Sequence, residues 1–431
     1  MIGTGYVGLV SGTCFADIGN KVYCVDKDKN KINKLNSSIS TIFEPGLNEI
    51  IKKNRESGRL IFTTNLTQAA NNSDIIFICV GTPNNKGSQS VDLTYVYSAI
   101  RDISKVIKNK KIIVTKSTVP VGTGDEIEKI LNKHKKKNIE VISNPEFLRE
   151  GEALRDFRFP DRIVIGANNN KVFKIMKSLY QPLINKGAKY FTTTRRGAEL
   201  IKYASNAFLA TKITFINELA NLCEVAKINI KDVSLGMGSD ARIGSRFLRA
   251  GPAYGGSCFP KDTKGLVSTG DKFKVDLSVV KSVIKSNFNR VSLHTKRIEK
   301  IVGKNLKSKK IIFLGVTFKP NTDDMRDSTS LKMIPYLLKK GAKIEYYDPT
   351  GEKKEFKKLK NCKFNSSVKN ICKNADLLIL HTEWDEFKSL DFKKLVKNKK
   401  FKLFDLRNLY NYNDMVRKKI KYYSVGRPNT N

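Results

Sequence analysis

One of the seven cysteines of the chain lies in a glycine-rich segment, Gly255 to Asp262, which reads GGSCFPKD. Pro260 fits the first turn of a helix, so Cys258 is predicted to lie near the N-cap of that helix. A helix N-terminus lowers the pKa of a thiol and makes it a better nucleophile. Asp262 follows four residues after Cys258 and is expected to face the same site. A buried structural thiol is the alternative for Cys258, and the other six cysteines are expected to be packing residues.

A second motif with chemical meaning is the GxGxxG formed by Gly3, Gly5 and Gly8. A helix is expected directly after it, and a strand over residues 22–25 leads to Asp26, 23 residues beyond Gly3. This arrangement lets the backbone approach a pyrophosphate at a helix N-terminus and offers a carboxylate to the ribose hydroxyls. An acid at this position repels a 2′-phosphate, so NAD is favoured over NADP. The alternative is a tight turn without a cofactor.

The segment before these glycines is unusually short, because only Met1 and Ile2 precede Gly3. The first strand of a dinucleotide-binding sheet normally contains several apolar residues. We therefore expect the true start of the protein to lie upstream of Met1 rather than the central strand to be short.

A thiol beside NAD suggests aldehyde chemistry. The thiolate would add to an aldehyde, a hydride would leave, and water would hydrolyse the thioester. Such a scheme needs oxyanion stabilisers and a carboxylate that handles water. Lys202 and Asn206 are spaced i, i+4 in an expected long helix, and Glu146 and Glu150 follow an expected strand, as does Thr118. Taken singly, each of these five residues is more readily explained as a solvated surface group.

The elements that must position these residues alternate between short apolar strands and helical stretches, which indicates an α/β fold. A stretch without Gly or Pro, residues 198–226, predicts a long helix suited to be a spine and a dimer surface. The helix expected over residues 330–340 ends at Gly341. The predicted strands have the ranges 21–25, 74–80, 111–115, 140–143, 162–165, 311–315, 343–347, 376–380 and 401–404.

We expect two Rossmann-like parallel-sheet domains joined by a long helix within a helical central domain. Residues 1–190 would bind NAD, residues 191–302 would form the helical central domain with the cysteine loop, and residues 303–431 would form the second Rossmann-like domain.

Composition narrows the class of protein further. With 80 Lys and Arg against 41 Asp and Glu the formal charge is +39, but the lysines are spread along the whole chain. This spread is typical of solvated faces or of a field that attracts an anionic small substrate, so we expect no nucleic-acid partner. No apolar run approaches the roughly 20 residues of a membrane span, so no membrane partner is expected. An odd cysteine count without CxxC indicates reduced thiols in the cytoplasm, and three scattered histidines indicate no metal site.

Taken together, the motifs resemble the UDP-glucose/GDP-mannose dehydrogenase family over essentially the whole chain. Members of this family oxidise the C6 alcohol of a sugar nucleotide to a carboxylate with two NAD. The resemblance rests on the segments 3–10, 116–123, 144–150, 242–244, 255–262, 315–319 and 347–349, together with Lys202 and Asn206.

The resemblance implies a role for each candidate residue. Cys258 would be the nucleophile. Lys202 and Asp262 would transfer protons and stabilise the oxyanion, with help from Asn206. Thr118 and Glu150 would position the hydrolytic water, and Glu146 would assist the acid–base steps.

The family also implies a homodimer, with residues 191–302 as the dimerisation domain and residues 303–431 as the UDP-sugar-binding domain. It further implies two sets of binding residues. The NAD contacts would be Gly3, Gly5, Tyr6, Val7, Gly8, Asp26, Lys31, Thr82, Thr118, Glu150, Lys261 and Arg326. The sugar nucleotide, UDP-glucose, would be held by Glu146, Phe147, Leu148, Arg149, Glu150, Lys202, Asn206, Phe247, Leu248, Arg249, Ala250, Gly251, Gly255 and Lys319, with Arg407 a weaker candidate. Arg242 would reach across the dimer interface to the partner's substrate.

Three alternatives remain open at this point. The form of the cysteine segment resembles UDP-glucose enzymes more than those acting on N-acetylmannosamine, and GDP-mannose or another nucleotide sugar is the runner-up substrate. A two-electron dehydrogenase of the 3-hydroxyacid type would need no thiol. A basic binding module without catalysis would bind nucleic acid in a salt-sensitive way.

Overall fold

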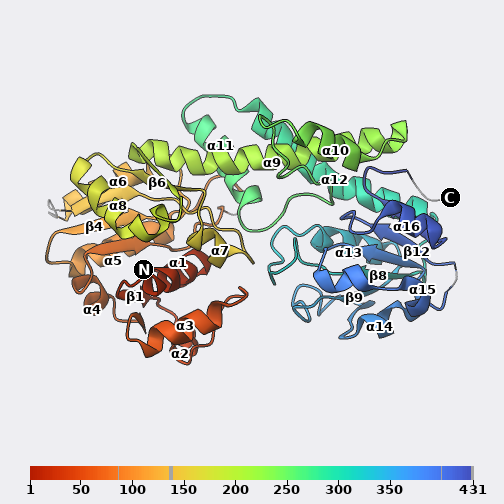
Figure 1. Ribbon diagram of the computed structural model, residues 1–431, viewed down its shortest axis with the longest axis horizontal. Coiled ribbons are helices and arrows are strands. Elements are labelled where there is room, and N and C mark those ends of the chain that lie inside the picture. Colours follow the sequence, from red (N-terminus) through yellow and green to blue (C-terminus); the bar gives the residue numbers. More distant parts are fainter. Residues whose placement is uncertain (86, 135–138, 399, 429–431) are drawn as a thin grey trace. The chain divides into compact units, whose positions relative to one another are not determined.

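The computed structural model describes residues 1–85, 87–134, 139–398 and 400–428. The chain forms two compact units. The first unit contains Met1–Ser205 and Lys264–Asp276, and the second contains Asn206–Thr263 and Leu277–Asn431. Figure 1 shows that each unit has a sheet with helices packed around it.

The first unit is an α/β sheet whose strands are short and largely buried. Its strands are β1 (Val22–Val25), β2 (Leu60–Thr63), β3 (Ile75–Ile78), β4 (Lys111–Thr115), β5 (Ile139–Ser143), β6 (Arg162–Gly166) and β7 (Lys189–Thr193). Its helices are α1 (Tyr6–Asp17), α2 (Lys29–Asn36), α3 (Leu47–Glu56), α4 (Leu66–Asn71), α5 (Thr94–Val106), α6 (Thr123–Lys133), α7 (Ala153–Arg158) and α8 (Asn170–Ile184).

The two residues before the glycine motif occupy the centre of this sheet. Ile2 bridges in parallel to Val25 at the end of β1 and to Ile78 at the end of β3. Its N–H donates to the Phe77 carbonyl at 2.8 Å, and its carbonyl accepts from the Cys79 N–H at 2.8 Å. Ile2 thereby joins the β1–β2 pair to the β3-β4-β5-β6-β7 sheet and sets Gly3 at the carboxyl ends of its neighbours.

The expectation of parallel strands is confirmed for β1 to β5, but β6 meets β5 antiparallel through Ser143 and Gly166. Because of this pairing, the segment that follows β5 runs beside β6. Asn144 Nδ2 donates to the Val164 carbonyl at 3.0 Å, and the Arg162 guanidinium lies 3.9 Å from the centre of the Phe147 ring. The reversed strand thus supports the loop that carries the predicted carboxylates.

Helices connect the sheets and form the central part of the chain. The helix predicted over residues 198–226 is confirmed as α9 (Arg195–Ala226), which begins in the first unit and continues in the second. Glu199 on α9 accepts the N–H groups of Gly122 and Gly124 at 2.7 and 2.8 Å and so caps α6. The other helices of this part are α10 (Ile230–Gly238), α11 (Phe259–Lys272) and α12 (Ser278–Val302).

The second unit contains a six-stranded parallel sheet of order β10-β9-β8-β11-β12-β13, the doubly wound arrangement. Its strands are β8 (Lys310–Leu314), β9 (Lys343–Tyr347), β10 (Cys362–Phe364), β11 (Leu377–Leu380), β12 (Lys402–Asp405) and β13 (Lys421–Ser424). Its helices are α13 (Ser330–Lys339), α14 (Val368–Ile371), α15 (Phe392–Leu395) and α16 (Tyr412–Arg417), with short 3₁₀ turns at Cys372–Asn374 and Asp385–Ser389. Among the described residues, no helix combines the length and the apolar character that crossing a membrane requires.

Candidate functional site

The glycine motif of the first unit has the geometry that a dinucleotide needs. Gly5 is the N-cap of α1, and Gly3 has a φ of +96°. A Cβ at Gly8 would lie 1.9 Å from the Gly3 carbonyl oxygen, so only glycine lets the helix approach the strand this closely. The motif therefore leaves backbone N–H groups at the start of α1 able to face a pyrophosphate.

The acid at the end of β1 is held ionised. Asp26 Oδ2 accepts the N–H and the hydroxyl of Thr4 at 2.9 and 2.7 Å. Partial burial acts to raise the pKa of Asp26, but the hydrogen bonds from Thr4 outweigh it and hold the pKa below its usual value. Lys31 Nζ lies 4.0 Å from the same oxygen. These features fit the ribose of NAD, and they place the Lys31 ammonium beside the Asp26 carboxylate.

Two further cofactor candidates meet at the carboxyl ends of β3 and β4. The Thr82 hydroxyl donates to the Thr118 carbonyl at 3.0 Å, and the Ser117 hydroxyl donates to the Val80 carbonyl at 2.7 Å. Of the three remaining cofactor candidates, Glu150 belongs to the first unit, and Lys261 and Arg326 belong to the second. The Arg326 side chain is exposed and pairs with Asp324 at 2.9 Å.

Glu146 and Lys202 form a buried ion pair in the first unit. Lys202 Nζ lies 3.2 Å from Glu146 Oε1, and both side chains are almost fully buried. Glu146 Oε2 accepts the Leu148 N–H at 2.5 Å, which bends the loop around its own carboxylate. The Lys202 ammonium also lies 5.2 Å from the centre of the Phe147 ring. A lysine and a carboxylate that are paired and shielded from solvent can exchange a proton with a substrate hydroxyl.

The first unit contains another buried lysine, Lys116, for which sequence reasoning proposed no role. Lys116, directly after β4, donates to Asn144 Oδ1 at 3.2 Å and to the Tyr180 hydroxyl at 3.3 Å. Burial lowers the pKa of Lys116 to about 8, although the negative charge of Glu146 acts to raise it. In the sequence, Lys116 stood out only as the first residue of the segment 116–123, directly after an expected strand.

Replacement of Lys116 by methionine is expected to raise the free energy of unfolding by about 1–2 kcal/mol at pH 7. The lowered pKa corresponds to roughly 3 kcal/mol of penalty for the buried charge, and lost hydrogen bonds offset part of the gain. Between about pH 8 and pH 10.5 the native state binds fewer protons than the unfolded state, so wild-type stability rises with pH there. Urea titrations at pH 7 and pH 10 should show the advantage of the variant shrinking; a variant that is less stable at pH 7 would contradict this expectation.

The cysteine segment of the second unit has the predicted helix-cap geometry. α11 begins at Phe259, so Cys258 precedes its first residue and Pro260 is its second. The Asp262 N–H donates to the Cys258 carbonyl at 2.8 Å, which is the first hydrogen bond of the helix. Cys258 is partly exposed. The thiol therefore lies where the partial positive charge of the helix favours a thiolate.

Asp262 anchors a polar cluster next to this thiol segment. Its side chain is 1% exposed and accepts Asn206 Nδ2 at 2.6 Å and Lys261 Nζ at 2.5 Å. Asn206 lies on α9 four residues after Lys202, so one helix supplies a side chain to each of the two groups. The i, i+4 prediction correctly placed both residues on one helix, whereas their separate partners became visible only in the structure.

The glycines before Cys258 allow a close approach of an aromatic ring. A Cβ at Gly256 would lie 2.6 Å from the ring of Phe318, and a Cβ at Gly255 would lie 2.5 Å from the Asp327 carbonyl. The Gly256 N–H donates to the Arg326 carbonyl at 2.8 Å. The segments 315–319 and 326–327 of the second unit therefore hold the thiol loop.

The other substrate candidates of the second unit lie on segments held by buried side chains. Arg290 Nε donates to the Gly251 carbonyl at 2.8 Å, and Asn217 Oδ1 accepts the Gly251 N–H at 2.8 Å. Gly251 ends the stretch Phe247–Gly251, in which Phe247 has a φ of +66°. This stretch is thus fixed at one end by two helices, α9 and α12.

Three single candidate residues also belong to the second unit. Arg407 donates to the His381 carbonyl at 2.8 Å and to the Phe318 carbonyl, and it pairs with Glu383 at 3.0 Å. The Lys319 ammonium lies 5.7 Å from the centre of the Phe318 ring. The Arg242 side chain is 90% exposed and pairs with Asp240 at 2.6 Å. Arg407 therefore already serves to hold the segment 315–319.

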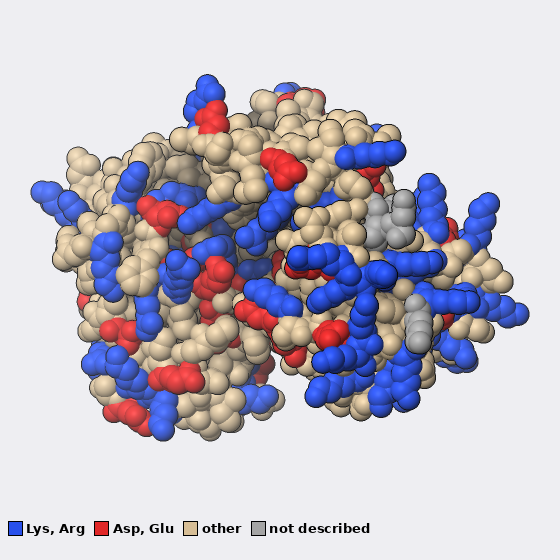
Figure 2. Space-filling model, turned by 45° about the vertical axis from the view of Figure 1, so that its right-hand side comes forward, with Lys and Arg blue, Asp and Glu red and all other residues tan. Residues whose placement is uncertain are grey.

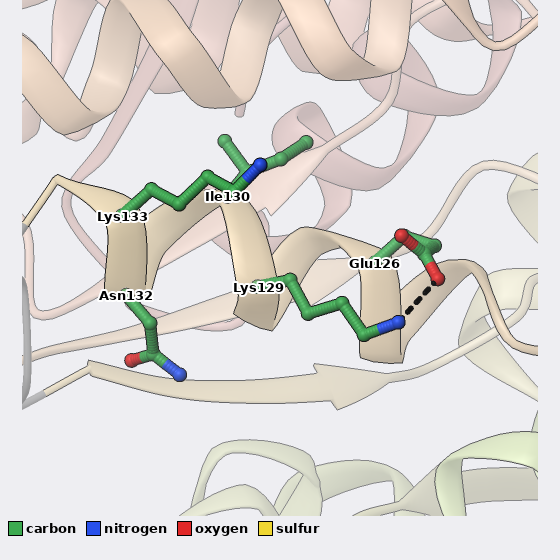
Figure 3. A pocket seen from close by; sticks show the side chains of 5 residues that line it. All are labelled: Glu126, Lys129, Ile130, Asn132 and Lys133. Carbon is green, nitrogen blue, oxygen red and sulfur yellow. Dashed lines mark hydrogen bonds and ion pairs between the residues drawn. The ribbon is translucent and has the colours of Figure 1, made fainter.

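A surface hollow lies apart from the candidate residues. It has a volume of about 470 Å³ and is lined by five side chains of α6, Glu126, Lys129, Ile130, Asn132 and Lys133 (Figure 3). Glu126 and Lys129 pair with each other at 2.9 Å, and none of the five is a candidate residue. In the described part of the chain, no group of His, Cys, Asp or Glu side chains is arranged to hold a metal ion.

Positive side chains are spread over the face of the molecule that Figure 2 shows. Figure 2 shows Lys and Arg side chains over much of the visible face, with fewer Asp and Glu side chains among them. Such a surface attracts small anions in general and does not mark a single binding patch.

Comparisons with known proteins identify the family. Residues 1–184 match the NAD binding domain of the UDP-glucose/GDP-mannose dehydrogenase family, residues 196–289 its central domain, and residues 312–412 its UDP binding domain. UDP-glucose 6-dehydrogenase of Rhizobium meliloti (strain 1021) is 47% identical over 432 residues, which cover 99% of each chain. The enzyme of the same description from Rickettsia prowazekii (strain Madrid E) is 45% identical over 99% of this chain and 98% of its own.

Solved structures agree with this result. A UDP-glucose dehydrogenase from Pyrobaculum islandicum has a TM-score of 0.90 and 33% identity, and the match covers 99% of this chain and 96% of that one. A UDP-D-ManNAc dehydrogenase from Pyrococcus horikoshii, at 24% identity and a TM-score of 0.86, shares the fold over 99% and 98% of the two chains. The chain therefore belongs to the UDP-glucose/GDP-mannose dehydrogenase family, a family of oxidoreductases.

Proposed function

We propose that this protein oxidises UDP-glucose to UDP-glucuronate in two NAD-dependent steps, with Cys258 as the covalent nucleophile. The observation that carries the proposal is the position of Cys258 at the N-cap of α11, one helical turn from the buried Asp262 cluster. The relatives described as UDP-glucose 6-dehydrogenases and the glycine motif with Asp26 support the choice of substrate and cofactor.

Bound NAD supplies a hydride acceptor for C6 in each oxidation. The Lys202–Glu146 pair takes up the proton of the C6 hydroxyl in the first step: one proton of the Lys202 ammonium passes to Glu146 at 3.2 Å, and the amine so formed accepts the hydroxyl proton. The Cys258 thiolate then adds to the aldehyde carbon, and the new C–S bond leaves an oxygen that Asn206, Lys202 and Asp262 stabilise and protonate.

Hydride loss from this adduct gives a thioester, which water hydrolyses with release of the thiolate. Thr118 and Glu150 would position that water. In total, one alcohol, one water and two NAD give one carboxylate, two NADH and three protons, so atoms and electrons balance.

The proposed binding residues follow the same division. NAD would be held by the glycine motif, with Tyr6 and Val7, and by Asp26, Lys31, Thr82, Thr118, Glu150, Lys261 and Arg326. The UDP-sugar would be held by residues 146–150 and 247–251 together with Lys202, Asn206, Gly255, Lys319 and Arg407, with Arg242 of the partner subunit added across a dimer interface.

We also propose functional domains at residues 1–190, 191–302 and 303–431. A location in the cytoplasm is proposed as well, and the seven free cysteine thiols support it.

The experiment that tests this function counts NADH against a panel of sugar nucleotides. Purified protein is expected to form two NADH for each UDP-glucose consumed, and few or none with GDP-mannose or UDP-N-acetylmannosamine. One NADH per substrate would favour the two-electron hydroxyacid type. The absence of NADH with every sugar nucleotide would refute the proposal.

A homodimer through α9 is also proposed. Phe208, Phe215 and Leu222 recur every seven residues on this helix and are 66%, 49% and 61% exposed, which is unusual for large apolar side chains in a row. A second copy of the helix is the partner that such a stripe fits.

The double variant Phe208→Glu with Phe215→Glu is expected to convert the dimer to a monomer, because burying two carboxylates at an apolar contact costs several kcal/mol. Sedimentation velocity at micromolar concentration measures the change. Val416→Glu on α16, an exposed apolar position outside the stripe, is the control and should leave the sedimentation coefficient unchanged. A double variant that sediments like wild type would contradict the α9 dimer.

A further inference from the structure

A carboxylate that is remote in sequence holds the end of the loop with the candidate glutamates. Glu44 belongs to the segment that connects α2 to α3, and its side chain is buried. Its Oε2 accepts the Gly151 N–H at 2.7 Å, and its Oε1 accepts the N–H groups of Ala153 and Leu154 at 2.7 and 3.3 Å. The N-cap residue of α7, Glu152, makes no side-chain cap, so Glu44 satisfies the first N–H groups of that helix instead.

The same carboxylate also contacts the cofactor helix. Tyr6, the first residue of α1, donates its hydroxyl to Glu44 Oε2, and the hydroxyl oxygen accepts the Gly151 N–H at 2.8 Å. Burial and the hydrogen bond to Glu44 raise the pKa of the Tyr6 phenol, so it remains a donor at neutral pH. Gly151 has a φ of +79° and directly follows Glu150.

The loop is therefore fixed at both ends within the first unit. At its start, the Asn144 N–H donates to the Thr115 carbonyl at 2.9 Å, and Asn144 Oδ1 accepts from Lys116 and Tyr180. At its end, Gly151 is held by Glu44 and Tyr6. Glu146 and Glu150 both belong to the segment between these two anchors.

We propose that Glu44 and Tyr6 form a clasp that fixes loop 144–151 to the first turn of α1 and so positions Glu146 and Glu150 for the sugar nucleotide. The inference rests on the proposed function for its kinetic consequences only. In the clasp, the Glu44 carboxylate and the Tyr6 hydroxyl act through the loop backbone, so their role there is a positioning one; the proposed NAD contact of Tyr6 is separate from it. Opening one anchor lets the loop shift, and misplacement by about 1 Å costs on the order of 100-fold in rate.

Glu44→Gln is the principal test, because the amide keeps the size of the side chain but turns an N–H group toward donors that need acceptors. We expect the KM for UDP-glucose to rise and kcat to fall, each by about 10- to 100-fold. The NAD concentration that half-saturates the shift in melting temperature should stay within about twofold, because the glycine motif is intact. Tyr6→Phe should change KM and kcat in the same direction but less, because Glu44 keeps its backbone contacts.

Asp17→Asn is the matched control. Asp17 binds Arg158 at the other end of α7 at 3.1 Å and Lys53 at 3.0 Å, but it does not contact the loop. This variant should lower the melting temperature without changing the KM for UDP-glucose. If Glu44→Gln lowers the melting temperature and leaves KM and kcat per folded molecule unchanged, or behaves like Asp17→Asn, the clasp is refuted.

Hydrogen exchange separates a failure of the clasp from a failure of the proposed function. Amides of residues 146–151 should exchange at least about tenfold faster in Glu44→Gln than in wild type, with no such change in Asp17→Asn. Unchanged exchange there overturns the clasp even if the wild-type enzyme oxidises UDP-glucose. Faster exchange supports the clasp even if the wild-type enzyme forms no NADH, a result that would refute only the proposed function.

Discussion

Cys258→Ala is expected to lower the rate of the complete oxidation, which forms two NADH per UDP-glucose, by a factor on the order of 10³ or more. Without the thiol, no covalent bond can hold the half-oxidised carbon, and the second hydride has no adduct to leave from. A stopped assay with NADH and UDP-glucuronate counted separately measures the loss. The fold should persist, because Cys258 is only partly buried and its carbonyl, which starts α11, is unchanged.

Cys258→Ser gives a second readout of the same step. A serine hydroxyl can take the place of the thiol in the adduct, but the ester it forms hydrolyses slowly without a good leaving group. Mass spectrometry of acid-quenched protein should therefore show a uronyl adduct at position 258. Cys362→Ser is the matched control, because Cys362 is also a partly exposed thiol but lies on β10 and outside the candidate groups. Wild-type turnover in Cys258→Ala would remove this residue from the mechanism.

Local sequence signals predicted the elements whose pattern is set by neighbouring residues. Strands β4 and β9 have the predicted bounds, and α9 starts only three residues before its predicted range. The N-cap position of Cys258 followed from Pro260 alone, since proline prefers the first turn of a helix. These features depend on residues within one or two turns of one another.

Elements whose stability comes from distant partners were missed. β2, β7, β10 and β13 were not predicted; β7, for example, is a partly exposed strand of polar and aromatic residues that forms because β6 pairs with it. The antiparallel step from β5 to β6 also had no local signal. In each case the hydrogen bonds of the neighbouring strand, rather than the pattern of the segment itself, decide the structure.

The same limit applies to the candidate site. The residue types were recognisable, but their partners were not, because Lys202 and Glu146 are 56 positions apart and so are Asn206 and Asp262. Two short helices are capped by remote carboxylates, α6 by Glu199 and α7 by Glu44. A single acid gives no sign in the sequence that it will cap a helix 77 residues away, as Glu199 does, or 109 residues away, as Glu44 does.

Lys202→Met is expected to lower the free energy of unfolding by about 3 kcal/mol and kcat by a factor of about 10²–10⁴. The loss of stability follows because Glu146 would be left as a buried carboxylate without its cation. The loss of rate follows because the proposed proton acceptor for the C6 hydroxyl is gone. Urea unfolding and steady-state kinetics on the same preparation measure the two effects.

The double variant Lys202→Met with Glu146→Gln separates these causes. Once the carboxylate is neutral, no charge is left unpaired, so stability should return to within about 1 kcal/mol of wild type. The rate should stay low, because neither residue can then move a proton. Arg195→Met is the control. It removes another buried cation of α9, which pairs with Asp125 and Glu128, and should lower stability without lowering kcat per folded molecule. Should the double variant regain activity together with stability, the Lys202–Glu146 pair would be a structural contact, and the proton acceptor would have to be another residue.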